Sequence, residues 1–283
     1  MEVRTIGVVG AGTMGSGIAQ VAAEAGLPVI LRDIDEKFVR RGLGIINKNL
    51  GRAVEKGRKT KGEAAEIADR IRGTVDLSEL KEADLVIEAV VEDIELKKKL
   101  YSDMDKICRP ETVLASNTSG LSITEMASAT VRPEKVIGMH FFNPVPVMKL
   151  VEVTRGAATG EDTFNLIMDT ARKLGKEPIA VNEAPLFVVN RILVPMINEA
   201  AYVLMEGIAS AEDIDKGMML GANHPIGPLA LADLVGIDVL LAVQDTLYKE
   251  TGDSKYRPCP LIRKLVRAGH LGRKSGRGFY NYG

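Results

Sequence analysis

The chain has 283 residues, of which 46% are hydrophobic and 27% charged, and its 37 basic residues nearly balance its 38 acidic residues. This is the composition of a globular protein that can form a sizeable core, and the length suggests about two domains. A net charge of −1 argues against broad binding to nucleic acid or to a membrane surface. No uncharged apolar run approaches the ~18–20 residues that span a bilayer.

Cysteine content and the N-terminus indicate the compartment. Cys108 and Cys259 lie far apart and fit neither a disulfide framework nor the spacing of a metal site. Reduced thiols of this kind are typical of cytosolic proteins. The chain runs directly into the strand-like residues 5–9, with no basic and apolar leader before them. We therefore expect a cytoplasmic protein with no metal site.

The first two thirds of the chain alternate between strand and helix patterns. This alternation predicts an α/β fold of the Rossmann type, a doubly wound and mostly parallel sheet with helices on both faces. The expected elements, in chain order, are a strand at 3–9, a helix at 13–26, a strand at 29–31, a long polar helical stretch at 35–71, a strand at 84–87, a charged helix at 92–107 and strands at 112–115, 135–139 and 150–153.

Strand patterns end near residue 184. Apolar residues then recur at helical spacing over 187–206, 211–220 and 228–250. We predict a dinucleotide-binding domain at 1–184, with the 35–71 stretch as a helical insertion, and an all-helical domain for substrate binding and dimerisation at 185–283. The later helices hold more apolar residues than one small domain needs for its own core, which predicts a homodimer.

A glycine-rich motif follows the first strand. Gly10, Gly12 and Gly15 form a G-x-G-x-x-G pattern, with Thr13 and Met14 between the last two, and Asp33 ends the next strand. In a dinucleotide site the first glycine permits a tight turn, the second admits the pyrophosphate and the third allows close helix packing. An acid at the end of the second strand accepts from the ribose hydroxyls and repels a 2′-phosphate. The motif therefore predicts NAD as cofactor, although Arg32 beside Asp33 could tolerate that phosphate.

His140 is the candidate acid/base among three histidines. It sits at the carboxyl end of the 135–139 strand, where ligands bind in open α/β sheets. Glu152 interrupts the apolar run 150–153, and a carboxylate there needs a partner or faces solvent. A turn at 143–146 would bring Glu152 beside His140, where it would hold one tautomer and raise the basicity of the ring. The competing interpretation is an edge-strand glutamate on a solvated face.

Two further polar groups are candidates. Ser116, Asn117, Thr118 and Ser119 leave the end of the 112–115 strand, where they form either a site loop or a cap before a helix near Ser122. The second group is Asn190, which stands where the preceding apolar run predicts an apolar residue.

With these motifs in place the chain resembles the 3-hydroxyacyl-CoA dehydrogenase family nearly end to end. Within that family it is most similar to the bacterial short-chain 3-hydroxybutyryl-CoA dehydrogenases. The segments that carry the resemblance are Ala115-Ser116-Asn117-Thr118-Ser119, Gly138-Met139-His140-Phe141-Phe142-Asn143-Pro144, Met148-Lys149-Leu150-Val151-Glu152-Val153, Val188-Val189-Asn190-Arg191 and the tail Gly272–Tyr280.

The resemblance implies roles for the matching positions. His140 is the acid/base and Glu152 its partner, while Ser119 and Asn190 bind the substrate oxygen and the thioester region. Positions that contact the cofactor in the family are matched by Asp33, Glu92, Lys97, Asn117 and Asn143.

Two positions depart from the family pattern. Leu186 stands where the family usually has glycine, in Pro-Gly-Phe, and Gly120 stands where it often has a second serine. If position 186 requires a positive φ, a leucine there strains the backbone.

A basic stripe offers a site for the acyl carrier. Residues 40–61 hold eight basic residues and one acid, and Lys48, Arg52 and Lys56 recur every four residues on one helix face. Coenzyme A carries a 3′-phosphate and a pyrophosphate, which such a face would bind, although a solvated charged surface is equally consistent with the pattern. No aromatic residue lies between these cations, which disfavours nucleic acid.

The sequence thus predicts an enzyme that transfers a hydride between NAD(H) and C3 of a short-chain 3-hydroxyacyl-CoA, with 3-hydroxybutyryl-CoA and acetoacetyl-CoA as the expected pair. One alternative is a 3-hydroxyacid dehydrogenase with a catalytic lysine, which the His–Glu pair disfavours. A second is a non-catalytic NAD-binding structural protein of the lambda-crystallin type. Retention of Ser119, His140, Glu152 and Asn190 together favours catalysis.

Overall fold

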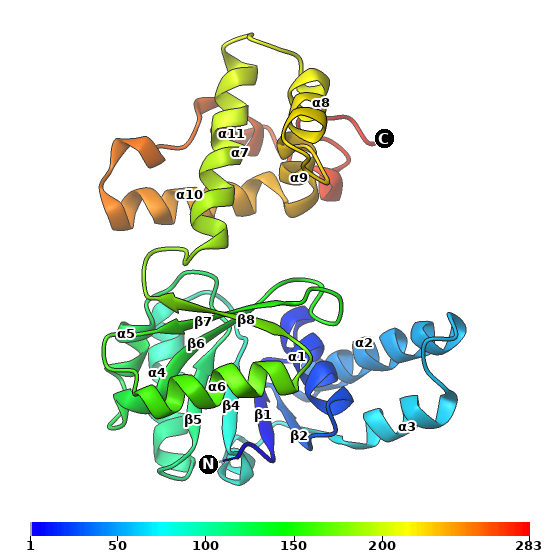
Figure 1. Ribbon diagram of the computed structural model, residues 1–283, viewed down its shortest axis with the longest axis vertical. Coiled ribbons are helices and arrows are strands. Elements are labelled where there is room, and N and C mark those ends of the chain that lie inside the picture. The colour runs from blue at the N-terminus through cyan, green and yellow to red at the C-terminus, as the bar shows by residue number, and fades with distance from the viewer. Residues whose placement is uncertain (1) are drawn as a thin grey trace. The chain divides into compact units, whose positions relative to one another are not determined.

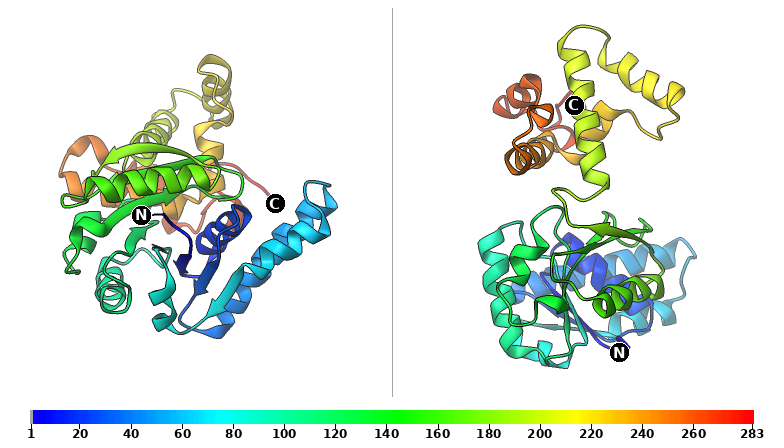
Figure 2. Two further views of the ribbon diagram at one scale, coloured as in Figure 1. Left: turned by 60° about the horizontal axis from the view of Figure 1, so that its bottom comes forward. Right: turned by 60° about the vertical axis from the view of Figure 1, so that its left-hand side comes forward.

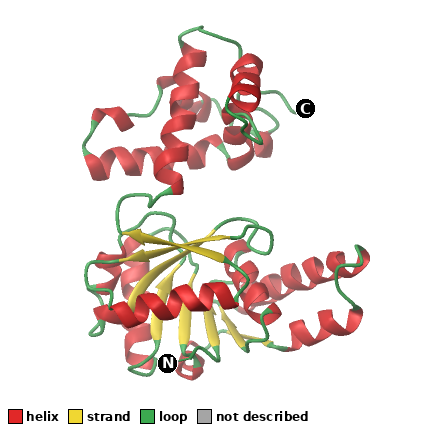
Figure 3. Cartoon of the chain, viewed as in Figure 1, coloured by secondary structure: helices red, strands yellow, loops and turns green. Residues whose placement is uncertain are grey.

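The computed structural model describes residues 2–283, which form two compact units divided after Phe187 (Figure 1). The first unit is built on one eight-stranded sheet with the strand order β3-β2-β1-β4-β5-β6-β7-β8 (Figure 3). Its strands are β1 (Ile6–Val9), β2 (Val29–Arg32), β3 (Ile71–Thr74), β4 (Leu85–Glu88), β5 (Val113–Ser116), β6 (Val136–Phe141), β7 (Leu150–Arg155) and β8 (Glu177–Asn182).

The strand directions confirm the predicted Rossmann-type fold. All neighbouring strands of the described sheet run parallel except β6 and β7, which are antiparallel. The carboxyl ends of β1, β4, β5 and β6 therefore share one edge, and β7 turns back from that edge beside β6. The helices of this unit are α1 (Thr13–Glu24), α2 (Glu36–Glu55), α3 (Lys61–Asp69), α4 (Ile94–Ile107), α5 (Ile123–Ala127) and α6 (Glu161–Lys173).

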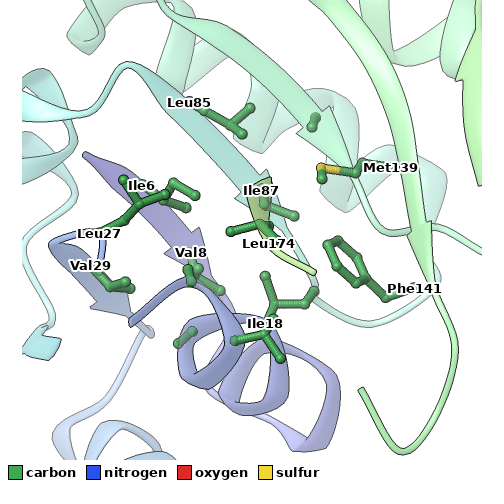
Figure 4. Close-up of a cluster of buried hydrophobic side chains, with 14 of the residues drawn as sticks. Ile6, Val8, Ile18, Leu27, Val29, Leu85, Ile87, Met139, Phe141 and Leu174 are labelled. Atoms are coloured by element: carbon green, nitrogen blue, oxygen red, sulfur yellow. The ribbon is translucent and has the colours of Figure 1, made fainter. Parts of the chain in front are cut away.

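Helices cover both faces of the sheet (Figure 2). On one face, Val8 and Ile87 pack with side chains from α1, α2, α3 and α6, and Figure 4 shows Ile18, Met139 and Phe141 in the same cluster. On the other face, Val9 and Val86 pack with side chains from α4 and α5. Because alternate residues of a strand point to opposite faces, a strand that is apolar throughout is buried on both sides.

The region from 35 to 71 differs in part from its sequence prediction. The expected single helical stretch is two helices, α2 and α3, that are joined by a turn, and residues 71–74 form the edge strand β3. Thr60 begins α3 with a capping box, in which its side chain accepts from Glu63 N–H and the Glu63 carboxylate accepts from the Thr60 N–H. Two of the four residues of β3 are exposed, so the strand lacks the apolar run that identified the central strands.

The second unit consists of helices in the part of the chain that the structure describes. They are α7 (Val189–Met205), α8 (Ala211–Gly221), α9 (Pro228–Val235), α10 (Ile237–Thr251) and α11 (Pro260–Arg267). The helical pattern predicted over 228–250 is divided into two helices, because Gly236 adopts a φ of 108° and separates α9 from α10. The buried carboxylate of Asp233 anchors the C-terminal tail by accepting from the N–H groups of Phe279 and Tyr280.

Candidate active site

The glycine-rich loop connects β1 to α1 at the edge where the parallel strands end. Gly10 has a φ of 103°, and a β-carbon there would lie 2.6 Å from the carbonyl oxygen of Ala89. A β-carbon on Gly15 would lie 1.7 Å from the carbonyl oxygen of Gly10, so only glycine permits this packing of helix on turn. Gly12 has open space where its side chain would be, and no side chain caps the helix that it begins. The free N–H groups of this helix start fit a phosphate.

Asp33 ties the end of β2 to the glycine loop. Its Oδ2 accepts a 2.6 Å hydrogen bond from the Ala11 N–H, and its Oδ1 accepts from the Ile34 N–H. Asp33 and Ala11 line a cavity of about 460 Å³ together with Gly12, Arg32 and Phe38. A carboxylate, an apolar wall and free amide donors in one cavity are what an adenosine diphosphate group requires.

His140 and Glu152 face each other directly across β6 and β7. The His140 Nδ1 lies 2.7 Å from Glu152 Oε2, and both side chains are buried. The predicted pair is therefore formed, and the alternative of a glutamate on a solvated face was wrong. Because the carboxylate only accepts, Nδ1 carries the proton and Nε2 is left as the basic nitrogen.

Aromatic rings enclose the imidazole. The ring centroid of Phe142 lies 4.6 Å from that of His140, and the centroid of Phe187 lies 5.9 Å from it. This apolar surround strengthens the interaction between His140 and Glu152 by excluding water. Sequence reasoning did not identify Phe187, which lies 47 positions from His140 and belongs to an apolar run like many others.

The loop after β5 lies beside this pair. Asn117, at its start, accepts a hydrogen bond from the Phe141 N–H, which links the loop to the strand that carries His140. Ser119 follows at the turn, where its N–H donates to Glu92 Oε1 over 2.6 Å. Ser122 caps α5 by accepting from the Glu125 N–H, so the polar run serves as both a site loop and a helix cap.

A buried ion pair is linked to the same loop through Glu92. Lys97 Nζ lies 2.6 Å from Glu88 Oε1 and 3.2 Å from Glu92 Oε2, and the side chains of Lys97 and Glu88 are almost fully buried. Glu88 also accepts from the Ser116 hydroxyl and the Val90 N–H. Sequence reasoning missed Glu88, although a carboxylate ending the apolar run of β4 is the same signal that identified Glu152.

Comparison with known proteins assigns the family. The model of the 3-hydroxyacyl-CoA dehydrogenase NAD-binding domain matches residues 5–184, and the model of the family's C-terminal domain matches residues 187–282. The chain belongs to the 3-hydroxyacyl-CoA dehydrogenase family. The predicted resemblance is thereby confirmed, and with it the NAD cofactor.

Three relatives show how far this similarity extends. The chain is 54% identical to a probable 3-hydroxybutyryl-CoA dehydrogenase of Bacillus subtilis, over 100% of this chain and 98% of the relative. It is 51% identical to the 3-hydroxybutyryl-CoA dehydrogenase of Clostridioides difficile, over 98% and 99% of the two chains. A crystal structure of (S)-3-hydroxybutyryl-CoA dehydrogenase from Ralstonia eutropha matches with a TM-score of 0.97 and 51% identity, covering 100% of both chains.

The basic stripe of this dehydrogenase borders a second cavity. Arg52 on α2 and Lys56, the residue that follows this helix, line a space of about 390 Å³ with Gln20, Pro144 and Val147. The stripe thus reaches the loop that follows His140. Lys48, the third residue of the stripe, does not line this cavity.

The remaining predicted residues lie in separate places. Asn143 is exposed at the start of the loop after β6, where its peptide bond to Pro144 is cis. Asn190 is the second residue of α7 and belongs to the second unit. Among the residues that the structure describes, no helix has the length and apolar character to cross a bilayer.

Proposed function

We propose that this dehydrogenase interconverts (S)-3-hydroxybutyryl-CoA and acetoacetyl-CoA with NAD(H) as cofactor. The observation that carries the proposal is the 2.7 Å contact between His140 and Glu152 at the edge of the sheet that also holds the glycine loop. The substrate follows from relatives that are named 3-hydroxybutyryl-CoA dehydrogenases and that match this chain over almost its whole length. A fold alone does not establish a substrate, whereas a site and near relatives together support one.

Proton transfer is assigned to His140. In the oxidation direction its Nε2 takes the proton of the substrate 3-hydroxyl, and in reduction it returns that proton to the oxygen. Glu152 holds the ring so that Nε2 faces outward, and it stabilises the imidazolium that forms as the proton arrives. NAD(H), which the glycine loop and Asp33 would hold, would supply the hydride chemistry at C3.

The charge that develops on the substrate oxygen needs donors. We assign this role to the Ser119 hydroxyl and the Asn190 side-chain amide, as the family pattern implies. Glu92 holds the Ser119 loop through the Ser119 N–H, and Lys97 holds Glu92. Because Lys97 is almost fully buried and contacts the carboxylates of Glu88 and Glu92, we propose that it positions Glu92 and, through Glu92, the loop after β5.

The acyl carrier is assigned to the α2 stripe. Arg52 and Lys56 are exposed cations at the cavity bordered by the loop after β6. The negatively charged phosphates of coenzyme A would be attracted by these cations. Glu24 is the acid among the residues that line this cavity, and its charge is offset by Lys59, whose Nζ lies 3.7 Å from Glu24 Oε1. This arrangement favours a coenzyme A thioester over a free acid.

Assembly and compartment complete the proposal. The second unit exposes large apolar side chains that its own core does not use, and we propose that a second copy of the chain covers them in a homodimer. They include Ile192, Met205, Ile208, Leu220, Leu234 and Val239.

We propose a cytoplasmic location, since Cys108 and Cys259 are free thiols in a chain whose relatives include bacterial enzymes.

A steady-state assay tests the function directly. Acetoacetyl-CoA with NADH should give a much higher kcat/KM than free acetoacetate, and 3-oxoacyl-CoA substrates of increasing length should show the chain-length preference. Tight NADH binding without turnover of any acyl-CoA would instead favour the structural-protein alternative. Turnover of free 3-hydroxyacids in place of thioesters would favour the alternative that uses a catalytic lysine.

A further inference from the structure

Two consecutive residues at the end of the first unit have left-handed backbone. Leu186 has a φ of 64° and Phe187 a φ of 56°, although neither is glycine. A side chain at such a φ is strained, and strain of this kind persists only where the surrounding packing holds it. Position 186 thus has the positive φ at which a leucine strains the backbone, and this strain requires a physical reason.

The packing of both side chains gives that reason. Leu186 and Phe187 are 3% and 4% exposed, and the Phe187 ring lies beside His140. Leu186 lies over Gly120. A β-carbon added to Gly120 would lie 2.5 Å from Leu186 Cδ2, 3.2 Å from its Cα and 3.3 Å from its N. The leucine therefore occupies the space that a side chain at position 120 would fill.

Gly120 directly follows Ser119 in the turn after β5. On one side this turn is fixed by Glu92, whose Oε1 accepts from the Ser119 N–H and from the Thr118 hydroxyl. Thr118 Oγ1 in turn accepts from the N–H groups of Gly120 and Leu121. Leu186 packs on Gly120, the residue after Ser119, so the turn is held by hydrogen bonds to Glu92 and Thr118 and by an apolar contact.

We propose that Leu186 and Gly120 are a coupled pair of positioning residues that fix the Ser119 turn. The two departures from the family pattern are then a single feature, because Leu186 supplies the bulk that a side chain at position 120 would otherwise supply. The strain at Leu186 is held by this contact and by the packing of Phe187 beside His140. The assignment of Ser119 to the substrate oxygen rests on the function proposed above.

A double-mutant cycle tests the pair. In the wild-type background, Gly120→Ser places its β-carbon against Leu186 and displaces the turn. Because a misplacement of ~1 Å can cost about 10²-fold in rate, kcat should fall by roughly 10- to 100-fold, with the KM for NADH little changed. Combined with Leu186→Gly, which clears the space and relaxes the positive φ, the same Gly120→Ser change should restore most of the lost kcat.

Further variants separate positioning from general damage. Leu186→Ala keeps the strained φ but removes the packing, so kcat should fall, and it should fall no further in a Ser119→Ala background. Gly44→Ser is the control for the glycine change, because a β-carbon on Gly44 contacts nothing within 4 Å. Leu174→Ala removes a buried leucine outside the site and should lower the melting temperature while leaving kcat unchanged.

The same cycle measured on the melting temperature needs no substrate. Non-additive shifts, with Gly120→Ser harmful only when Leu186 is present, would support the pair. Additive losses in both kcat and melting temperature would overturn it. A wild-type chain that turns over no acyl-CoA would overturn the proposed function and the assignment to Ser119, whereas the melting cycle would still decide whether the two residues are coupled.

Discussion

The carboxylate of Asp33 accepts a 2.6 Å hydrogen bond from the backbone N–H of Ala11, so the acid at the end of β2 is also a structural support of the glycine loop. Asp33 therefore has two functions that mutation can separate. Its charge opposes a 2′-phosphate, and its Oδ2 keeps the loop in place. Sequence reasoning assigned the first function and did not reveal the second.

The first prediction concerns cofactor choice. The wild-type enzyme should have a higher kcat/KM with NADH than with NADPH, and Asp33→Ser should narrow that gap because it removes the repelling charge. Asp33→Asn removes the charge but keeps an oxygen that can accept from the Ala11 N–H. It should therefore narrow the difference in kcat/KM between the two cofactors, with a smaller increase in the KM for NADH than Asp33→Ser causes. Steady-state kinetics with both cofactors measure this. A wild-type preference for NADPH would contradict the prediction.

The inner strands were predictable because each is a mostly apolar run that the sheet buries. The same patterns placed His140 at the carboxyl end of β6 and Glu152 within β7. Both edge strands, β3 and β8, were missed, since each has exposed residues where the inner strands have an apolar run. The break at Gly236 was missed because the apolar spacing continues through it.

Most features of the site that could not be predicted from the sequence are contacts between residues far apart in the chain. Lys97 lies in a charged stretch whose pattern predicts a solvated helix, yet its side chain is buried and pairs with Glu88 and Glu92. The contact of Leu186 with Gly120 joins positions 66 residues apart and depends on two strained φ angles. Neither relationship follows from local periodicity.

The second prediction concerns the buried ion pair. Lys97→Met leaves the Glu88 carboxylate buried without a cation, and breaking a buried pair in this way typically costs about 3–5 kcal/mol of stability. Adding Glu88→Gln should recover part of the loss, because it removes the unpaired charge. Lys98→Met is the matched control: this neighbouring lysine is partly exposed, and its pairs with the exposed Glu95 and Glu125 are screened by solvent and should contribute little to stability. Urea unfolding measures all four proteins, and equal losses for the two lysine variants would refute the argument.

The third prediction concerns coenzyme A. Arg52→Ala and Lys56→Ala should each raise the KM for acetoacetyl-CoA while leaving the KM for NADH unchanged, because these cations line the cavity beside the loop after β6. Raising the salt concentration should reduce the difference from wild type, since exposed charges are screened. Arg172→Ala, on an exposed pair with Asp169, is the control. An unchanged KM for acetoacetyl-CoA in both variants would show that the stripe is a solvated charged surface with no part in binding coenzyme A.

The fourth prediction concerns assembly. Light scattering at micromolar concentration should give about twice the chain mass of 30.5 kDa. Ile208 and Leu220 are 67% and 77% exposed, and replacing either with Asp should weaken the dimer only if that side chain lies in the interface. A wild-type mass of a single chain would show that the exposed apolar residues do not mediate self-association.

The fifth prediction concerns His140 and Glu152. Glu152→Gln keeps the shape and a hydrogen-bonding head, but an amide cannot stabilise the imidazolium that forms as the proton moves. The loss should therefore fall on kcat and leave NADH binding nearly intact. His140→Ala should lose on the order of 10²–10⁴-fold, the usual contribution of general acid–base catalysis.

The double variant distinguishes a pair from two independent residues. Because Glu152 acts through the ring that it holds, Glu152→Gln should cost little more once His140 has been replaced by Ala. Circular dichroism must first show that each variant is folded, since Glu152 is fully buried and His140 is almost fully buried. Losses that add in full would mean that the two residues act separately. Wild-type kcat in a folded Glu152→Gln variant would mean that the hydrogen bond between them has no part in the reaction.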